Sequence, residues 1–167
     1  MARWVALLRA VNVGGTGKLP MADLRRIATG LGFEAVETHL ASGNLIFTDD
    51  RPEAALREAL SGGLAAQMGR APGLLFRQSA ELEETFAALP YGDAAPSQVG
   101  ILFLDRPATE ADLVPRHQTS EVIAPIGRHI AIHFPDGMGR SRLSLPAMER
   151  GTMRNLNTLA ALVKKSR

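Results

Sequence analysis

Two glycine-rich turns beside basic residues are the segments of this sequence whose residue types could do chemistry. The first, Gly14-Gly15-Thr16-Gly17-Lys18, follows an apolar run and precedes a helical pattern. The second, Asp136-Gly137-Met138-Gly139-Arg140-Ser141-Arg142, follows a predicted strand. Loop N–H groups, a helix N-terminus and basic side chains together favour the binding of anions, phosphate above all. We therefore predict anion binding at both turns, and neither turn specifies a reaction.

The candidate anion-binding residues are glycines and polar or basic residues that lie in these turns or in polar segments expected near them. Arginine suits phosphate because its planar guanidinium donates two parallel hydrogen bonds. The alternative interpretation is structural: a strand-to-helix turn for the first segment and a solvated basic face for the second. The candidates are Arg9, Asn12, Gly14, Gly15, Lys18, Ser42, Asn44, Gly139, Arg140, Ser141, Arg142, Thr152, Arg154 and Asn155.

Known nucleotide and metal motifs fit these segments poorly. In the phosphate loop of nucleotide hydrolases, Asn12 would replace the leading glycine and Leu19 the hydroxyl that holds magnesium. Arg142 stands where a dinucleotide fingerprint has its third glycine. His129 and His133 share a strand face, but four residues at ~3.3 Å each separate them by about 13 Å, too far for one metal. We predict no cofactor and no metal, and leave open whether the protein is an enzyme.

Basic charge gathers toward the C-terminus, although the net charge of the 167-residue chain is only +2. From Ile126 onward there are eight basic residues and two acidic ones, so an anionic partner would bind there. Aromatic content is 5%, which disfavours base stacking on a sheet but leaves phosphate contacts open. The predicted partner is a phosphate-bearing small molecule or a nucleic-acid backbone.

Composition and the N-terminal segment bear on the cellular location. Hydrophobic residues make up 46% of the chain, cysteine is absent, and no stretch approaches the ~20 apolar residues that cross a bilayer. Arg9 interrupts the first apolar run, unlike the core of a signal peptide. We expect a cytoplasmic protein without membrane contact, and a homodimer is left open.

Hydrophobic periodicity predicts the elements that must position these residues. The first half has the order strand, helix, strand, strand, helix, strand of a split βαβ, ferredoxin-like domain. A further helix begins at Ser79, and a linker over 91–97 separates subdomains 1–90 and 98–167. The predicted ranges are Trp4–Val13, Pro20–Leu31, Val36–Leu40, Leu45–Thr48, Pro52–Met68 and Leu74–Arg77.

The second half is predicted to be an incomplete copy of the first, with a helix where the last strand would be expected. Thr109 and Asp112 resemble a capping box before a short helix, and a hairpin is centred on Gly127. The predicted class is α+β: two ferredoxin-like (split βαβ) subdomains packed together, the second incomplete with an added C-terminal helix. Its remaining ranges are the strand Val99–Leu104, the hairpin strands Glu121–Ala124 and His129–Phe134, and the helices Arg140–Arg150 and Asn155–Lys165.

Four segments resemble signature stretches of the bacterial domain of unknown function 1697 family. They are the residues from Ala6 to Gly15, Ser42 to Asn44, Gly137 to Ser141, and Thr152 to Asn155. The resemblance spans nearly the whole chain and implies a small cytosolic α+β protein of two subdomains with no established activity. The chain departs from the family pattern at Ala10, Ala41 and Leu156, where glycine, glutamine and tryptophan are typical.

Our leading hypothesis is a cytosolic protein that binds a phosphate-bearing ligand through Gly14–Lys18 and Gly139–Arg142. One alternative is a phosphoryl-handling enzyme, which magnesium-dependent turnover of nucleotides would reveal. Another is a homo-oligomeric interaction module without a ligand. The sequence leaves open the identity of the ligand and whether the two turns share one cleft.

Overall fold

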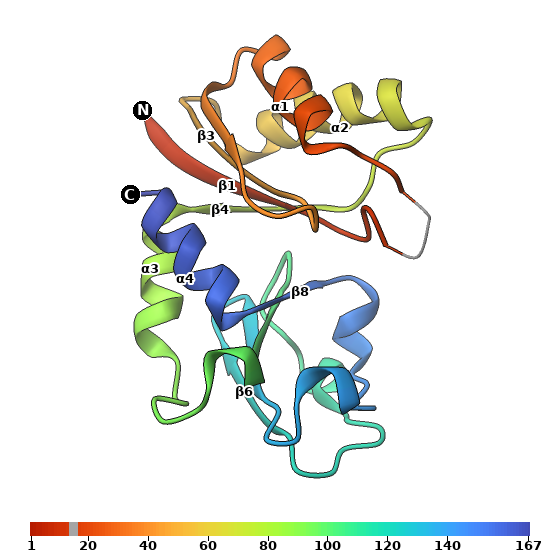
Figure 1. Cartoon of the computed structure of the whole chain (residues 1–167), viewed down its shortest axis with the longest axis vertical. Helices are drawn as coiled ribbons and strands as arrows, with labels where there is room; N and C mark the ends of the chain where they lie inside the picture. Colours follow the sequence, from red (N-terminus) through yellow and green to blue (C-terminus); the bar gives the residue numbers. More distant parts are fainter. Residues whose placement is uncertain (14–16) are drawn as a thin grey trace. The chain divides into compact units, whose positions relative to one another are not determined.

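The computed structural model describes residues 1–13 and 17–167, which form a mixed α+β fold. These residues contain two four-stranded antiparallel sheets and four α-helices (Figure 1). They group into two compact units, the first comprising Met1–Glu81 with Lys164–Arg167 and the second Leu82–Val163. By this grouping, the segment 91–97 that was expected to be a linker lies inside the second unit.

The first unit follows the predicted element order, and its strands are arranged β2-β3-β1-β4 with antiparallel neighbours. The boundaries of most elements differ by one or two residues, and the largest difference is in the first strand, which was predicted to continue to Val13 whereas β1 ends at Leu8. Ala10 and Asn12 have φ of 57° and 55°, a left-handed conformation that a strand does not accommodate. The elements are β1 (Ala2–Leu8), α1 (Met21–Gly30), β2 (Glu34–Thr38), β3 (Asn44–Asp49), α2 (Glu53–Met68) and β4 (Leu74–Gln78).

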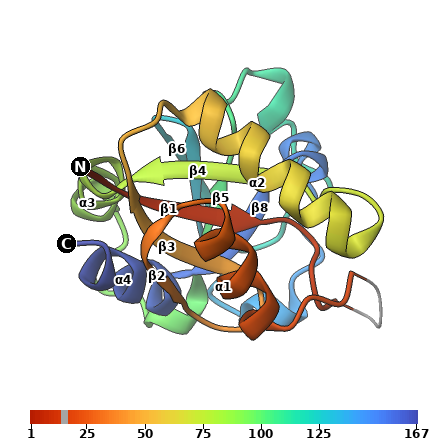
Figure 2. The same cartoon turned by 90° about the horizontal axis from the view of Figure 1, so that it is seen from above.

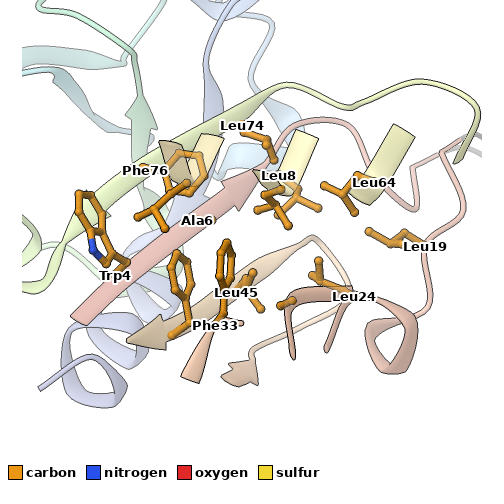
Figure 3. Close-up of a cluster of buried hydrophobic side chains, with 14 of the residues drawn as sticks. Trp4, Ala6, Leu8, Leu19, Leu24, Phe33, Leu45, Leu64, Leu74 and Phe76 are labelled. Atoms are coloured by element: carbon orange, nitrogen blue, oxygen red, sulfur yellow. The ribbon is translucent and has the colours of Figure 1, made fainter. Parts of the chain in front are cut away.

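Helices α1 and α2 cover the same face of this sheet (Figure 2), and the core of the first unit lies between them and the strands. On β1, every second residue from Trp4 to Leu8 faces this core, as the two-residue period of a strand requires (Figure 3). On α2, Leu56, Leu60 and Leu64 are completely buried on one stripe. The core therefore follows directly from the hydrophobic pattern.

Gly63, in the middle of α2, has a packing role that compensates for its poor helix propensity. A Cβ atom at this position would lie 2.8 Å from Cγ2 of Ile27 on α1, closer than side chains tolerate. The absent side chain therefore lets the two helices approach each other. The sequence pattern alone indicated only a weak point in the helix, at a cost of roughly 1 kcal/mol relative to alanine.

The second unit has four strands in the order β6-β7-β5-β8, so the expectation of a missing last strand is wrong. The predicted helix Arg140–Arg150 is also absent from this region, where short 3-10 turns occupy Met138–Arg140 and Pro146–Glu149. Pro146 lacks an N–H group for an interior helical bond, which confines it to the start of a turn. The elements are α3 (Ser79–Ala88), β5 (Val99–Phe103), β6 (Val122–Ile126), β7 (His129–His133), β8 (Thr152–Asn155) and α4 (Leu156–Lys165).

A cluster of ionic contacts centred on Asp112 joins the 3-10 turn Ala111–Leu113, which follows β5, to Arg150 at the end of the turn Pro146–Glu149. The carboxylate of Asp112 accepts two hydrogen bonds from the guanidinium of Arg150, at 2.7 and 2.9 Å. It also accepts the backbone N–H of Thr109 at 2.8 Å and a bond from Arg106 at 3.1 Å. These contacts, led by the bonds from Arg150, hold the pKa of Asp112 well below its ordinary value.

Replacing Asp112 with asparagine is expected to lower the melting temperature at neutral pH by an amount on the order of 5 °C. Because folding lowers this pKa, the carboxylate adds stability above its ordinary value of 3.8, and the gain is lost as pH falls below it. The difference between wild type and D112N should therefore shrink in acid, as followed by circular dichroism. The exposed Asp93→Asn change is the control, and a difference that stays constant with pH would contradict the ionic origin.

No helix in the described part of the chain combines the length and the apolar character that a membrane crossing requires.

Candidate functional site

The second unit contains a hollow of about 310 Å³ at the open end of the β6–β7 hairpin. A turn at Gly127, whose φ is 54°, joins the two strands, and the register pairs Val122 with His133 at the far end. The segments before β6 and after β7 therefore lie opposite each other. We call this site the hairpin hollow. One wall is 117–121, and the other comprises Phe134, Asp136, Gly137 and 140–142.

Hydrogen bonds join the two walls of the hairpin hollow at both ends and in between. Arg116 and Ser144 exchange two backbone bonds of 2.8 and 2.9 Å just outside the walls. The hydroxyl of Ser120 donates to Asp136 at 2.6 Å. The spacing of the walls is thus set before any ligand arrives, which lowers the entropic cost of binding.

Glu121 forms the third link between the walls. Its side chain is buried, and its carboxylate accepts the backbone N–H of Thr119 at 2.8 Å and the hydroxyl of Ser141 at 3.1 Å. These bonds lower the pKa of Glu121, and the bond from the Thr119 N–H has the largest effect. The carboxyl group is therefore ionised at neutral pH. Ser141 in turn accepts the N–H of Leu143 at 3.2 Å. Glu121 and Ser141 therefore fix the shape of the hollow.

Arg140 and Arg142 line the hairpin hollow with exposed side chains. Neither guanidinium forms a hydrogen bond or an ion pair with any residue that the structure describes. Each can present a planar fork of N–H donors to a ligand. Gly137, with φ of 93°, allows the chain to turn sharply from β7 toward these two residues.

The comparisons with known proteins identify the family of this chain. A protein-family model described as "Protein of unknown function (DUF1697)" matches residues 1–130. The chain belongs to the DUF1697 family. The fold is similar to that of the conserved bacterial protein SP0830 from Streptococcus pneumoniae, with 24% identity, a TM-score of 0.79 and coverage of 99% of both chains. No curated protein matches the sequence.

In this DUF1697 chain, three predicted site residues on or beside β8 do not line the hairpin hollow. The guanidinium of Arg154 donates to the hydroxyl of Thr152 at 2.6 Å, and burial lowers the pKa of Arg154 to about 10. Asn155 accepts the N–H of Thr158 at 2.9 Å, which makes it the N-cap of α4. Gly139 belongs to the 3-10 turn Met138–Arg140, as Arg140 does, but does not line the hollow either.

Two asparagines predicted as anion ligands organise loops of the first unit. The amide of Asn12 donates to the carbonyls of Leu19 and Ala41, both at 2.8 Å, and accepts the N–H of Leu19 at 2.8 Å. Asn44 is completely buried and donates to the carbonyl of His39 and to Ser42. Both amide groups are therefore engaged within the protein.

The remaining predicted residues of the DUF1697 chain lie near the first glycine turn. Gly14 and Gly15 lie outside the described residues. Arg9 lines a second hollow of about 420 Å³ together with Gly17 and with Arg70, which was not among the predicted residues. Lys18 is exposed. Among the described residues, no group of three or more histidine, aspartate or glutamate side chains is placed to hold a metal ion.

Sequence reasoning missed the wall formed by 117–121. Residues 117–120 are polar and show no periodicity, and Glu121 was predicted only as the first residue of a strand. Asp136 was placed at the start of the second glycine turn but was not named as a site residue. A usable signal was present, because the hairpin predicted around Gly127 places residue 121 opposite residue 134. Extending the predicted pairing by a few residues would have located the site.

Replacing Glu121 with alanine is expected to open the hairpin hollow, because the N–H of Thr119 and the hydroxyl of Ser141 lose their shared acceptor. Hydrogen–deuterium exchange at Thr119 should become at least about tenfold faster, and the melting temperature should fall. Glu149→Ala, at an exposed carboxylate, is the matched control. Unchanged exchange at Thr119 in the Glu121 variant would show that this carboxylate does not hold the wall.

Proposed function

We propose that this protein binds a phosphate-bearing small molecule in the hairpin hollow, where Arg140 and Arg142 contact the phosphate. One observation carries the proposal: two exposed guanidiniums line the same hollow and form no ion pair with described residues. Phosphate is the natural partner, because charge-assisted hydrogen bonds from arginine each contribute about 1.5–3 kcal/mol.

The acidic groups of the hollow favour a small molecule over a nucleic-acid backbone. Asp136 and Glu121 line the hollow together with the two arginines. A polymer would bring successive phosphates near these carboxylates, and like charges at close range repel one another. A single phosphate group can instead contact the arginines alone.

The finer description of the fold also belongs to the proposal. We infer that each unit is a variant of the ferredoxin-like arrangement, because strand orders β2-β3-β1-β4 and β6-β7-β5-β8 correspond position by position. In the second unit, 3-10 turns take the places of the two helices. Anion binding at Gly14–Lys18, a cytoplasmic location and a homodimer stay predictions.

Titration of the full-length protein with ribose 5-phosphate, followed by amide NMR shifts, tests the proposed function. We expect saturable shifts concentrated in 117–121 and 134–142, and a dissociation constant that rises with salt concentration. Inorganic phosphate should compete for the same resonances. Absence of shifts in these two segments at millimolar ligand would contradict the proposal.

A further inference from the structure

We propose that the ligand of the hairpin hollow is a mononucleotide, an inference that rests on the proposed function. Arg140 and Arg142 would contact the phosphate at one end of the ligand. The rest of the lining differs in chemistry, and it indicates what the phosphate is attached to.

Asp136 supplies an acceptor for hydroxyl groups. Its Oδ2 accepts the hydroxyl of Ser120 at 2.6 Å, and no other hydrogen bond to this carboxylate comes from a described residue. Because an ionised carboxylate has about four lone-pair sites, most of its accepting capacity is open to a ligand. The hydroxyls of a ribose are donors of the required kind, whereas a second phosphate would be repelled.

Aromatic rings contribute to both walls. His117 lines the hollow from the segment before β6, where its left-handed backbone, with φ of 57°, turns the chain. Phe134 lines it from the end of β7, and its backbone N–H is held by the carbonyl of Gln98 at 2.7 Å. Phe134 is 4% exposed and packs in the core of the second unit, so it supplies an apolar part of the lining. The ring of His117 is exposed and offers a face on which a nucleobase can stack.

The size of the hollow limits the ligand to one nucleotide. Its volume of about 310 Å³ lies at the small end of the range for ligand pockets, which runs from about 300 to 1,000 Å³. Two guanidinium forks suit a single phosphate group. A phosphate, hydroxyl donors and a planar ring within this volume describe a nucleoside monophosphate.

Calorimetric titration of the full-length protein with four compounds tests the inference: AMP, UMP, ribose 5-phosphate and uridine. We expect at least one mononucleotide to bind about tenfold more tightly than ribose 5-phosphate, because of base stacking. Uridine should bind at least about 100-fold more weakly than the nucleotide that binds best, because it lacks the phosphate.

Two variants locate the contacts. Asp136→Ala should weaken the binding of a ribonucleotide by about tenfold and change the affinity for its 2′,3′-dideoxy counterpart little. The control Asp93→Ala should change neither affinity. His117→Ala should reduce the preference for a mononucleotide over ribose 5-phosphate, with folding checked by circular dichroism.

The outcomes separate the two proposals. If ribose 5-phosphate binds as tightly as both mononucleotides, the present inference is wrong and the proposed function stands. If none of the three phosphate esters binds, the proposed function fails. If a mononucleotide binds equally well after Arg140 and Arg142 are replaced by alanine, it occupies another place, and both proposals for this hollow are overturned.

Discussion

Alanine at Phe47 is expected to lower the free energy of unfolding by about 3–5 kcal/mol. Phe47 on β3 is completely buried. Its ring stacks on that of Phe33, with centroids 4.2 Å apart, and meets Phe76 of β4 edge-on at 6.5 Å. Removing the ring loses its transfer free energy and leaves a cavity, because the closely packed core around it relaxes only partially.

Phe86 on α3 provides the matched control, because the same atoms are removed from a side chain that is 42% exposed. Phe86→Ala should change the free energy of unfolding by less than about 1 kcal/mol. Urea denaturation followed by circular dichroism measures both variants. Equal losses at the two positions would show that the aromatic cluster contributes no more than ordinary surface contacts.

Replacing Arg140 and Arg142 together with alanine is expected to weaken the binding of a phosphate ester at least about 100-fold. Two charge-assisted hydrogen bonds at about 1.5 kcal/mol each already amount to this factor. The melting temperature without ligand should stay within about 2 °C of wild type, because both side chains are exposed. Calorimetric titration and thermal denaturation separate these two effects.

Two further variants distinguish local contact from overall charge. R25A/R26A on α1 removes the same charge from exposed positions outside the hollow and should leave affinity nearly unchanged. R140K/R142K keeps the charge but loses the planar fork, and it should bind with intermediate affinity. If both alanine pairs weakened binding equally, the effect would come from net charge, and the arginines would have no direct role.

The first unit was predictable from the sequence because its pattern is strongly periodic. Leu56, Leu60 and Leu64 mark a helix, and the continuous apolar runs of β1 and β3 mark buried strands. Strand β8 was not predictable, since its four residues are mainly polar, and only pairing with β5 makes Thr152 and Arg154 buried. Pairing with β5 therefore makes this segment a strand, although its local sequence pattern does not indicate one.

The candidate site was predictable only in part. Arg140 and Arg142 were found from residue type and spacing, whereas Glu121 owes its role to hydrogen bonds formed after folding. The role of each asparagine side chain could not be predicted from the sequence, because an amide suits an anion site, a helix cap and a loop contact equally well. Asn12 and Asn155 are engaged as a loop contact and a helix cap, a distinction that requires coordinates.

The tight turn at Gly127 sets the register of β6 and β7, and this register determines which residues lie opposite each other at the hairpin hollow, at the other end of these strands. Five residues of β6 at ~3.3 Å each place the turn about 17 Å from the hollow. Inserting one residue at this turn would shift the β6–β7 pairing and carry 117–121 out of alignment with Asp136 and Ser141. Variation in hairpin length, far from any ligand, is thus a route by which related chains could lose or retune binding.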